Sequence, residues 1–255
     1  MIFEKSAVAV VSGGASGLGA ATAQKLSTMG FQVGIFDINE TAGEELATQL
    51  GGLFCRVDVA DPISVSKGFD SIISKFKHLR IMVNCAGIAP ASKTVSRGLP
   101  HDFATFAKTI QINLTGSFNC SSQAASLMAD NEPMGLDGAR GVIVNTASIA
   151  AYDGQIGQVA YAASKGGIVG MTLPMARDLA DKGIRVCAIA PGIFATPMVH
   201  GMPKEVQDAL GNQVPFPRRL GGAEEYADLV AHIIDNQMLN GEVIRLDGAI
   251  RMAPR

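Results

Sequence analysis

Features that would mark several other classes of protein are missing from this 255-residue sequence. Basic residues are not in excess, since 21 Lys and Arg stand against 23 Asp and Glu, so no nucleic-acid partner held by a basic surface is expected. Only 17% of the residues are charged and 47% are hydrophobic, which excludes a disordered chain. The length suits one large α/β domain or two small ones with a sizeable core.

Metal-site, disulfide and nucleotide-loop signatures are also lacking. No C-x-x-C pair, no H-E-x-x-H motif and no Gly-Lys dipeptide occurs, which argues against zinc, a metalloprotease helix and a Walker-type site. We expect no bound metal. The cysteines are far apart and are expected to be free thiols in a reducing compartment: Cys55, Cys85, Cys120 and Cys187.

Targeting and membrane segments are likewise not visible. No basic segment or cleavage site precedes the first apolar run, which disfavours a signal peptide. The longest uncharged run, Thr109–Ala129, is rich in Asn, Gln, Ser and Thr, which would be costly in lipid. We expect no membrane contact and a cytoplasmic protein, or a mitochondrial-matrix protein if a targeting peptide has been removed.

Short β-branched runs alternate with longer helical patterns along the chain. Strands are expected at Ala7–Val11, Gln32–Phe36, Leu53–Val57, Ile81–Asn84, Val142–Asn145, Arg185–Ala190 and Val243–Leu246. Helices are expected near Ala20–Met29, Glu40–Leu50, Ser64–Lys75, Phe103–Ala129, Ala160–Ala180 and Ala223–Asp235.

This alternation predicts an α/β fold: a single Rossmann-type domain over residues 1–255, with a doubly wound parallel sheet of seven strands and helices on both faces. Two segments interrupt the pattern. Asn131–Gly141 is expected to be a surface loop, and Gly192–Arg219 is long enough to be a lid or substrate loop.

Glycine is the abundant residue, at 29 of 255. Four glycines lie in the segment Ser12–Gly19, between the first expected strand and the first expected helix. Glycines there let the backbone turn tightly and approach a pyrophosphate at the helix N-terminus, although an ordinary βα turn is the alternative. Asp37 ends the second strand, where a carboxylate can bind the adenosine ribose of NAD and repel the phosphate of NADP. A solvated strand-end Asp is the alternative, and we expect NAD.

Tyr161 and Lys165 are four residues apart in a helical pattern and so share a helix face. A phenol has a pKa of about 10, and a neighbouring ammonium lowers it, which makes Tyr usable as a general acid or base. Ser148 follows an expected strand, at the sheet edge where α/β sites assemble, and could hold a substrate oxygen. A Tyr-x-x-x-Lys pair alone is common on solvated faces, so the prediction depends on the combination.

Taken together, these motifs resemble the short-chain dehydrogenase/reductase family over essentially the whole chain. The family's TGxxxGxG is similar to Ser12–Gly19, with Ser in place of Thr, and its NNAG to Asn84–Gly87, with Cys at the second Asn. Its PG motif matches Pro191-Gly192, with Thr196 following. Its catalytic tetrad matches Asn113, Ser148, Tyr161 and Lys165.

The resemblance implies a role for each tetrad residue. Tyr161 would exchange a proton with the substrate oxygen, and Ser148 would orient that oxygen. Lys165 would bind the nicotinamide ribose and lower the Tyr161 pKa, while Asn113 would help hold a water in the proton relay. The implied cofactor-binding residues are Gly13, Ser16, Gly17, Leu18, Gly19, Asp37, Asp58, Val59, Cys85, Ala86, Gly87, Tyr161, Lys165, Pro191, Phe194 and Thr196.

Longer stretches are similar to one subgroup of this family, the NAD-dependent dehydrogenases of short-chain 3-hydroxyacyl-CoA. This implies oxidation of an acyl-CoA-type substrate in fatty-acid or branched-chain amino-acid breakdown, and a homotetramer with Arg251–Arg255 near subunit contacts. The stretches are Asn145–Ala151, Gly154–Gln158, Ala163–Pro174, Gln213–Pro217 and Leu239–Met252, with Asn131–Pro133 similar to the subgroup's insertion.

From the residues alone the substrate prediction stays open. Gln155 and Gln158 lie where side chains can face a substrate, with Gln155 the expected contact beside Ser148 and Tyr161, or they cap the helix. Met198 and Met202 would line an apolar acyl pocket or simply pack. A 3-oxoacyl-acyl-carrier-protein reductase, a hydroxysteroid or sugar-alcohol dehydrogenase, and a cofactor-binding scaffold without essential chemistry remain alternatives.

Overall fold

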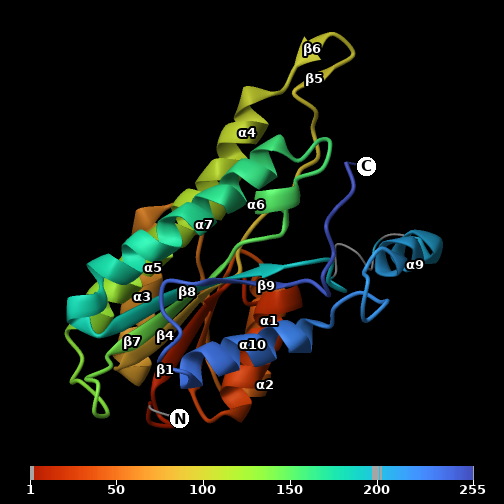
Figure 1. The fold of residues 1–255 in the computed structure, drawn as a ribbon. Coiled ribbons are helices and arrows are strands. Elements are labelled where there is room, and N and C mark those ends of the chain that lie inside the picture. The colour runs from red at the N-terminus through yellow and green to blue at the C-terminus, as the bar shows by residue number, and fades with distance from the viewer. Residues whose placement is uncertain (1–2, 197–200, 202, 255) are drawn as a thin grey trace.

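A computed structural model describes residues 3–196, 201 and 203–254 of the chain. Seven strands form one sheet in the order β3-β2-β1-β4-β7-β8-β9, and every neighbouring pair is parallel (Figure 1). The predicted doubly wound parallel sheet is therefore confirmed. Its strands are β1 (Val8–Ser12), β2 (Gln32–Asp37), β3 (Leu53–Arg56), β4 (Leu79–Asn84), β7 (Gly141–Thr146), β8 (Ile184–Pro191) and β9 (Val243–Leu246).

Helices cover both faces of this sheet, with α1, α2 and α10 on one side and α3, α5 and α7 on the other (Figure 1). The helices are α1 (Gly17–Thr28), α2 (Glu40–Leu50), α3 (Pro62–Phe76), α4 (Phe103–Ile110), α5 (Gly116–Ala129), α6 (Ala150–Asp153), α7 (Val159–Asp178), α9 (Lys204–Asn212) and α10 (Ala223–Asp235). A π-helical turn, η1 (Gln111–Thr115), joins α4 to α5, and a short 3₁₀ turn, η2 (Ala180–Lys182), follows α7.

The alternation of side chains along the strands produces two apolar layers. In β1, Ala9 and Val11 pack against α1 and α10, whereas Val8 and Val10 pack against α3 and α5. Every residue of β1, β4, β7 and β8 is buried, because these central strands are covered on both faces. This explains why their sequences are mostly apolar and do not alternate with polar residues; the exceptions near the start of β4 and β8 are the buried Arg80 and Arg185.

The strand order reverses beside β1, whose neighbours are β2 on one side and β4 on the other. Loops leaving the carboxyl ends of β1 and β4 therefore diverge to opposite faces and open a crevice between them, the usual ligand position in such sheets. The glycine segment follows β1 and residues Cys85–Gly87 follow β4, so both lie at this edge.

Three parts of the chain differ from the sequence-based expectation. The predicted helix Phe103–Ala129 is interrupted by η1, which holds Asn113. An exposed hairpin, β5 (Val95–Ser96) and β6 (Leu99–Pro100), was not predicted. The predicted substrate loop Gly192–Arg219 contains helix α9, while Met198 and Met202 lie outside the described residues.

Asn131–Gly141 forms the predicted loop, closed by a bridge between Met134 and Ala139. No helix in the described part of the chain is both long enough and apolar enough to cross a membrane.

Candidate active site

The segment after β1 makes a turn that only glycines allow. Gly13 has a φ of +64°, and a Cβ on it would lie 2.6 Å from the Ala86 nitrogen at the end of β4. A Cβ on Gly19 would collide with the carbonyl oxygen of Gly13. Gly17 also has a positive φ, of 53°. The glycine excess therefore serves, at these positions, to bring the backbone of two strand ends into close contact.

The N-terminus of α1 points out of this turn. Ser16 is the N-cap residue, and among the described residues no side chain caps the helix there. The first-turn amides are consequently left to bind an anion, with the helix dipole favouring negative charge. Leu18 anchors the turn by packing on the core below. The predicted residues Gly13, Ser16, Gly17, Leu18 and Gly19 thus form a cradle that fits a pyrophosphate.

Asp37 lies beside that cradle, at the end of β2. One carboxylate oxygen accepts a hydrogen bond from the Ala15 amide at 3.0 Å, and the other accepts one from the Asn39 amide at 3.0 Å. The carboxylate is therefore fixed next to the glycine turn, where the hydroxyls of an adenosine ribose would be recognised.

The residues predicted for the adenine side lie at the ends of β3 and β4. The Asp58 carboxylate accepts from the Ala60 amide at 2.9 Å, and Val59 is buried against Gly116. Cys85 contributes its backbone to this edge, since its thiol faces the interior beside Tyr226. Burial raises the pKa of the Cys85 thiol, so the sulfur stays neutral.

Ser148 and Tyr161 meet where β7 ends and α7 begins. Ser148 is buried, and its hydroxyl oxygen accepts a hydrogen bond from the Ala150 amide at 3.1 Å. Burial raises the pKa of Tyr161 above its ordinary value, and an interaction with the Ser148 side chain lowers it to a smaller extent. The two side chains therefore lie close together at the end of β7 and the start of α7.

Lys165 lies one turn further along α7 and is buried. Its ammonium donates to the carbonyl oxygen of Thr146 at 2.6 Å and lies 5.8 Å from the Tyr161 ring centroid. Burial lowers the pKa of Lys165 to about 8. The expected lowering of the Tyr161 pKa by Lys165 is not found, because desolvation of the buried phenol is the largest effect and raises its pKa.

Asn113 is completely buried in η1 and joins two elements by its side-chain amide. Its oxygen accepts from the Ile88 amide at 2.8 Å, and its nitrogen donates to the Ile88 carbonyl at 2.8 Å and to the Ser164 hydroxyl at 3.0 Å. A Cβ on Gly87 would lie 3.2 Å from the Asn113 oxygen and 3.8 Å from the Lys165 nitrogen. Asn113 therefore fixes the chain after β4 against the catalytic helix, beside Lys165.

The predicted nicotinamide-side residues follow β8. The Pro191 carbonyl accepts from the Ile149 amide at 3.1 Å, which ties this segment to the residue after Ser148. Phe194 is buried against Gly221, and the Thr196 amide donates to the Phe194 carbonyl at 2.9 Å. The structure thus brings every predicted site residue except Gln155 to the carboxyl edge of the sheet or the start of α7.

A cavity of about 460 Å³ lies next to this edge, lined by Lys93, Thr94, Val95, Gly154, Gln155, Ile156, Gly157, Gln158, Val159 and Ala162. The Gln155 side chain lines it but donates to the Ala253 carbonyl at 2.9 Å, and the Gln158 side chain accepts from the Gln155 amide at 3.0 Å. The Gln158 side chain makes no capping hydrogen bond to α7, so the capping alternative is not found for it, and substrate contact by Gln155 stays a prediction.

Sequence reasoning missed three residues near the site. The Thr146 carbonyl holds Lys165, and the Thr146 hydroxyl is hydrogen-bonded to Tyr226 from α10 at 2.7 Å. Arg245 on β9 pairs with Asp153 of α6. Thr146 could have been noticed as a strand-end residue two positions before Ser148, but Tyr226 and Arg245 carry no local signal.

Comparisons with known proteins agree with this geometry. A family model described as short chain dehydrogenase matches residues 7–207. A 3-hydroxyacyl-CoA dehydrogenase type-2 of Homo sapiens is 52% identical over 254 residues, covering 98% of this chain and 97% of that protein. The protein of the same name from Drosophila melanogaster is 51% identical, covering 98% and 99%.

The crystal structure of a 3-hydroxyacyl-CoA dehydrogenase type-2 from Mycobacterium avium superimposes with a TM-score of 0.95 at 42% identity, covering 98% of both chains. These likenesses confirm the family and the subgroup that the sequence motifs predicted.

Proposed function

Because the chain belongs to the short-chain dehydrogenase family of oxidoreductases, we propose that it transfers a hydride between NAD and the 3-hydroxyl carbon of a short-chain 3-hydroxyacyl-CoA. The observation that carries the reaction type is the placement of Ser148 and Tyr161 together at the end of β7 and the start of α7, with Lys165 buried on the same helix as Tyr161. The substrate class rests on the type-2 relatives, which share about half of their residues with this chain over nearly its whole length.

The described residues fit a dinucleotide. The uncapped start of α1 would hold the pyrophosphate. Asp37 would accept hydrogen bonds from the adenosine ribose, and its negative charge supports NAD over NADP. The sites implied by the family motifs, from Gly13 to Thr196, remain predictions. The bound cofactor would supply the hydride acceptor at its nicotinamide ring.

The residues of the chain would handle the proton. In the oxidation direction, the Tyr161 oxygen takes the hydroxyl proton of the substrate, and the Ser148 hydroxyl holds the substrate oxygen by a hydrogen bond. Lys165, whose pKa is about 8, is mostly protonated at neutral pH and would donate to the nicotinamide ribose. Its positive charge favours the phenolate that forms when Tyr161 has given up its proton.

The acyl group would occupy the cavity walled by the Gly154–Gln158 segment, which leads from Ser148 to Tyr161. The segment Gly192–Arg219, with α9, would cover the substrate. In this arrangement the substrate loop and the NAD-binding part belong to one domain over residues 1–255.

A kinetic panel tests the proposal. Acetoacetyl-CoA with NADH should be reduced, with loss of absorbance at the reduced-nicotinamide band, and longer 3-ketoacyl-CoA, steroid and sugar ketones should react more slowly. Tyr161→Phe should lower turnover by about 10²- to 10⁴-fold, the usual size of general acid–base catalysis, while NADH binding persists. Faster turnover of a steroid or acyl-carrier-protein substrate, or an active Tyr161→Phe variant, would contradict the proposal.

The subgroup resemblance also supports a homotetramer with Arg251 near its subunit contacts; Arg255 lies outside the described residues. All four cysteines are free thiols, which supports a reducing compartment such as the cytoplasm or mitochondrial matrix. Light scattering of the purified protein tests the oligomer, since a monomer or dimer would contradict it.

A further inference from the structure

Thirteen positions separate Ser148 from Tyr161, and the segment between them influences both the placement of these two side chains and the shape of the substrate cavity. Ser148 leads directly into α6, whose first amide bonds the Ser148 hydroxyl, and α6 leads into the cavity-lining segment Gly154–Gln158. Tyr161 follows in the first turn of α7. A displacement of α6 or of this segment would therefore alter the relative position of Ser148 and Tyr161 or the shape of the cavity.

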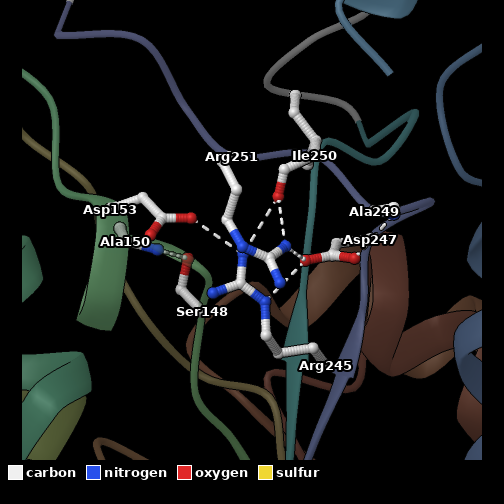
Figure 2. Close-up of polar contacts among 8 residues, drawn as sticks. All are labelled: Ser148, Ala150, Asp153, Arg245, Asp247, Ala249, Ile250 and Arg251. Atoms are coloured by element: carbon white, nitrogen blue, oxygen red, sulfur yellow. Dashed lines mark hydrogen bonds and ion pairs between the residues drawn. The ribbon is translucent and has the colours of Figure 1, made fainter. Parts of the chain in front are cut away.

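Arg245 holds α6 from the neighbouring strand β9 (Figure 2). Its guanidinium pairs with Asp153 at 2.8 Å and with Asp247 at 2.7 Å. The three side chains are only 21%, 19% and 7% exposed, so the charges are largely removed from water. The guanidinium also lies 5.2 Å from the ring centroid of Tyr152, the residue before Asp153. Arg245 therefore contacts the two residues at the end of α6.

The C-terminal segment holds the next part of the same connection. The Gln155 side chain donates to the Ala253 carbonyl at 2.9 Å, and the Ile156 amide donates to the Pro254 carbonyl at 3.0 Å. Both donors lie in the segment that lines the cavity. Since neither bond uses a C-terminal side chain, the contact depends on where the C-terminal backbone lies.

Arg245 also fixes the position of that backbone. It donates to the Ile250 carbonyl at 3.0 Å, and Asp247 accepts from the Ala249 amide at 2.9 Å (Figure 2). Ala249 has a φ of +67°, a conformation that costs an L-residue about 1 kcal/mol or more and persists only when its surroundings impose it. The turn Asp247–Ile250 is thus built around the same guanidinium that pairs with Asp153.

We propose that Arg245 and the segment Asp247–Pro254 form a positioning clamp for the Ser148–Tyr161 pair and for the substrate cavity. Arg245 acts on Ser148 through Asp153 and α6, and the C-terminal backbone acts on the cavity wall through Gln155 and Ile156. Neither part of the clamp touches the cofactor cradle at Gly13–Gly19. The substrate used to test this clamp depends on the proposed function, whereas the contacts that form the clamp do not.

The clamp predicts a separation of kinetic effects that a simple stabilising ion pair would not give. Arg245→Met leaves Asp153 without its cation and Asp247 with only Arg251, at 3.3 Å, and frees α6, so kcat should fall about 10- to 100-fold, as small misplacements of catalytic groups do. Deletion of 253–255 removes the two carbonyl acceptors, so in a variant that keeps the oligomeric state of the unmodified protein KM for acetoacetyl-CoA should rise about fivefold with kcat kept within about twofold. NADH affinity should remain unchanged in both variants.

Three further variants serve as comparisons. Deletion of Arg255 alone keeps both carbonyl acceptors and should behave as the unmodified enzyme. Arg245→Lys can pair with only one carboxylate and should give an intermediate kcat. Lys25→Met breaks an ion pair of similar length, 2.7 Å to Asp228, between α1 and α10, and should leave kcat and KM unchanged.

Amide hydrogen exchange gives a readout independent of the substrate. Exchange in the peptide covering 150–158 should accelerate in Arg245→Met and in the 253–255 deletion, whereas exchange in 13–28 should not. Unchanged exchange in 150–158, or a uniform loss of activity, NADH affinity and thermal stability, would overturn the clamp. If the unmodified enzyme does not reduce acetoacetyl-CoA, the proposed substrate is wrong, and the clamp is then judged by exchange and by the fastest ketone of the panel.

Discussion

Lys165 is a buried cation whose energetic cost depends on pH. Its pKa is about 8 in the folded protein, against an ordinary value of 10.5. Between these two values the unfolded chain binds more protons at this site than the folded one, so the free energy of unfolding rises with pH in that window. Below pH 8 the full cost is present, and it is recovered as the pH rises toward 10.5. The buried ammonium therefore lowers the stability of the folded protein, but it also places a positive charge beside Tyr161.

The Lys165→Met variant has no ammonium to titrate at this position, so its free energy of unfolding should lack this dependence on pH. Raising the pH from 7 to 10 should stabilise the unmodified protein relative to the variant by about 2 kcal/mol, at about 1.4 kcal/mol for each pKa unit. Groups that do not interact with Lys165 titrate in both proteins and cancel in the comparison, whereas the buried Cys85 thiol interacts with Lys165 and contributes to the difference. Urea unfolding at the two pH values measures the difference, and a difference that stays constant would show that Lys165 is not buried as a cation.

Asp37 allows charge and hydrogen bonding to be separated at the cofactor site. Asp37→Asn removes the negative charge and keeps one oxygen for the Ala15 amide, at the loss of the bond from the Asn39 amide, so the glycine turn should hold. We expect the preference for NADH over NADPH to fall by about tenfold or more, because a carboxylate no longer repels the ribose phosphate. The ratio of kcat/KM for the two cofactors measures this. An unchanged ratio would remove Asp37 from cofactor selection.

At the scale of the element, the turn from β1 into α1 combines backbone packing with ligand binding, and two substitutions separate them. Gly19→Ala places a Cβ against the Gly13 carbonyl and should destabilise the fold by about 1–3 kcal/mol, as overpacking does. Ser16→Ala removes a side chain that makes no capping bond, so stability should stay within about 0.5 kcal/mol while NADH binds more weakly.

Thermal unfolding and NADH fluorescence titration measure the two properties independently. Equal losses of stability in Gly19→Ala and Ser16→Ala would contradict this separation. So would an unaltered NADH affinity in Ser16→Ala, which would leave the serine without a role in the cradle.

Elements differed in how far the sequence could predict them. The central strands were predictable because burial on both faces demands largely apolar sequences, and the partly buried edge strands β3 and β9 are also short apolar segments. Helices α2 and α10 begin and end at the predicted residues. The β5–β6 hairpin was not, since its strands are two residues each and exposed, so no hydrophobic pattern marks them. The π-turn η1 was hidden inside a continuous helical pattern.

The same distinction holds for the site. Ser148 and Asp37 were predictable because sheet topology places strand ends together whatever the loops do. Arg245 pairs with Asp153 from 92 residues away in sequence, and this depends on β9 lying beside β8 in one particular register. Charge pairs of that kind leave no local pattern. They must be seen in the assembled sheet.

For the molecule as a whole, the proposed cofactor site joins two halves of the sheet. Its predicted residues follow β1, β2, β3 and β4 on one side and β7 and β8 on the other, so a bound dinucleotide would contact segments that are far apart in sequence. A ligand that binds only the folded state stabilises the whole domain, by about 2.7 kcal/mol at a hundredfold excess over its Kd.

For a domain of this size, that free energy corresponds to a rise in Tm of about 5–10 °C. NADH should produce this shift at fixed protein concentration, and NADPH at the same concentration should produce much less. In Asp37→Asn the two shifts should approach each other, because the carboxylate that separates them has lost its charge. Scanning calorimetry measures the shift without requiring turnover. Equal stabilisation of the unmodified protein by both cofactors would contradict the assignment of NAD, even if acetoacetyl-CoA proved to be the substrate.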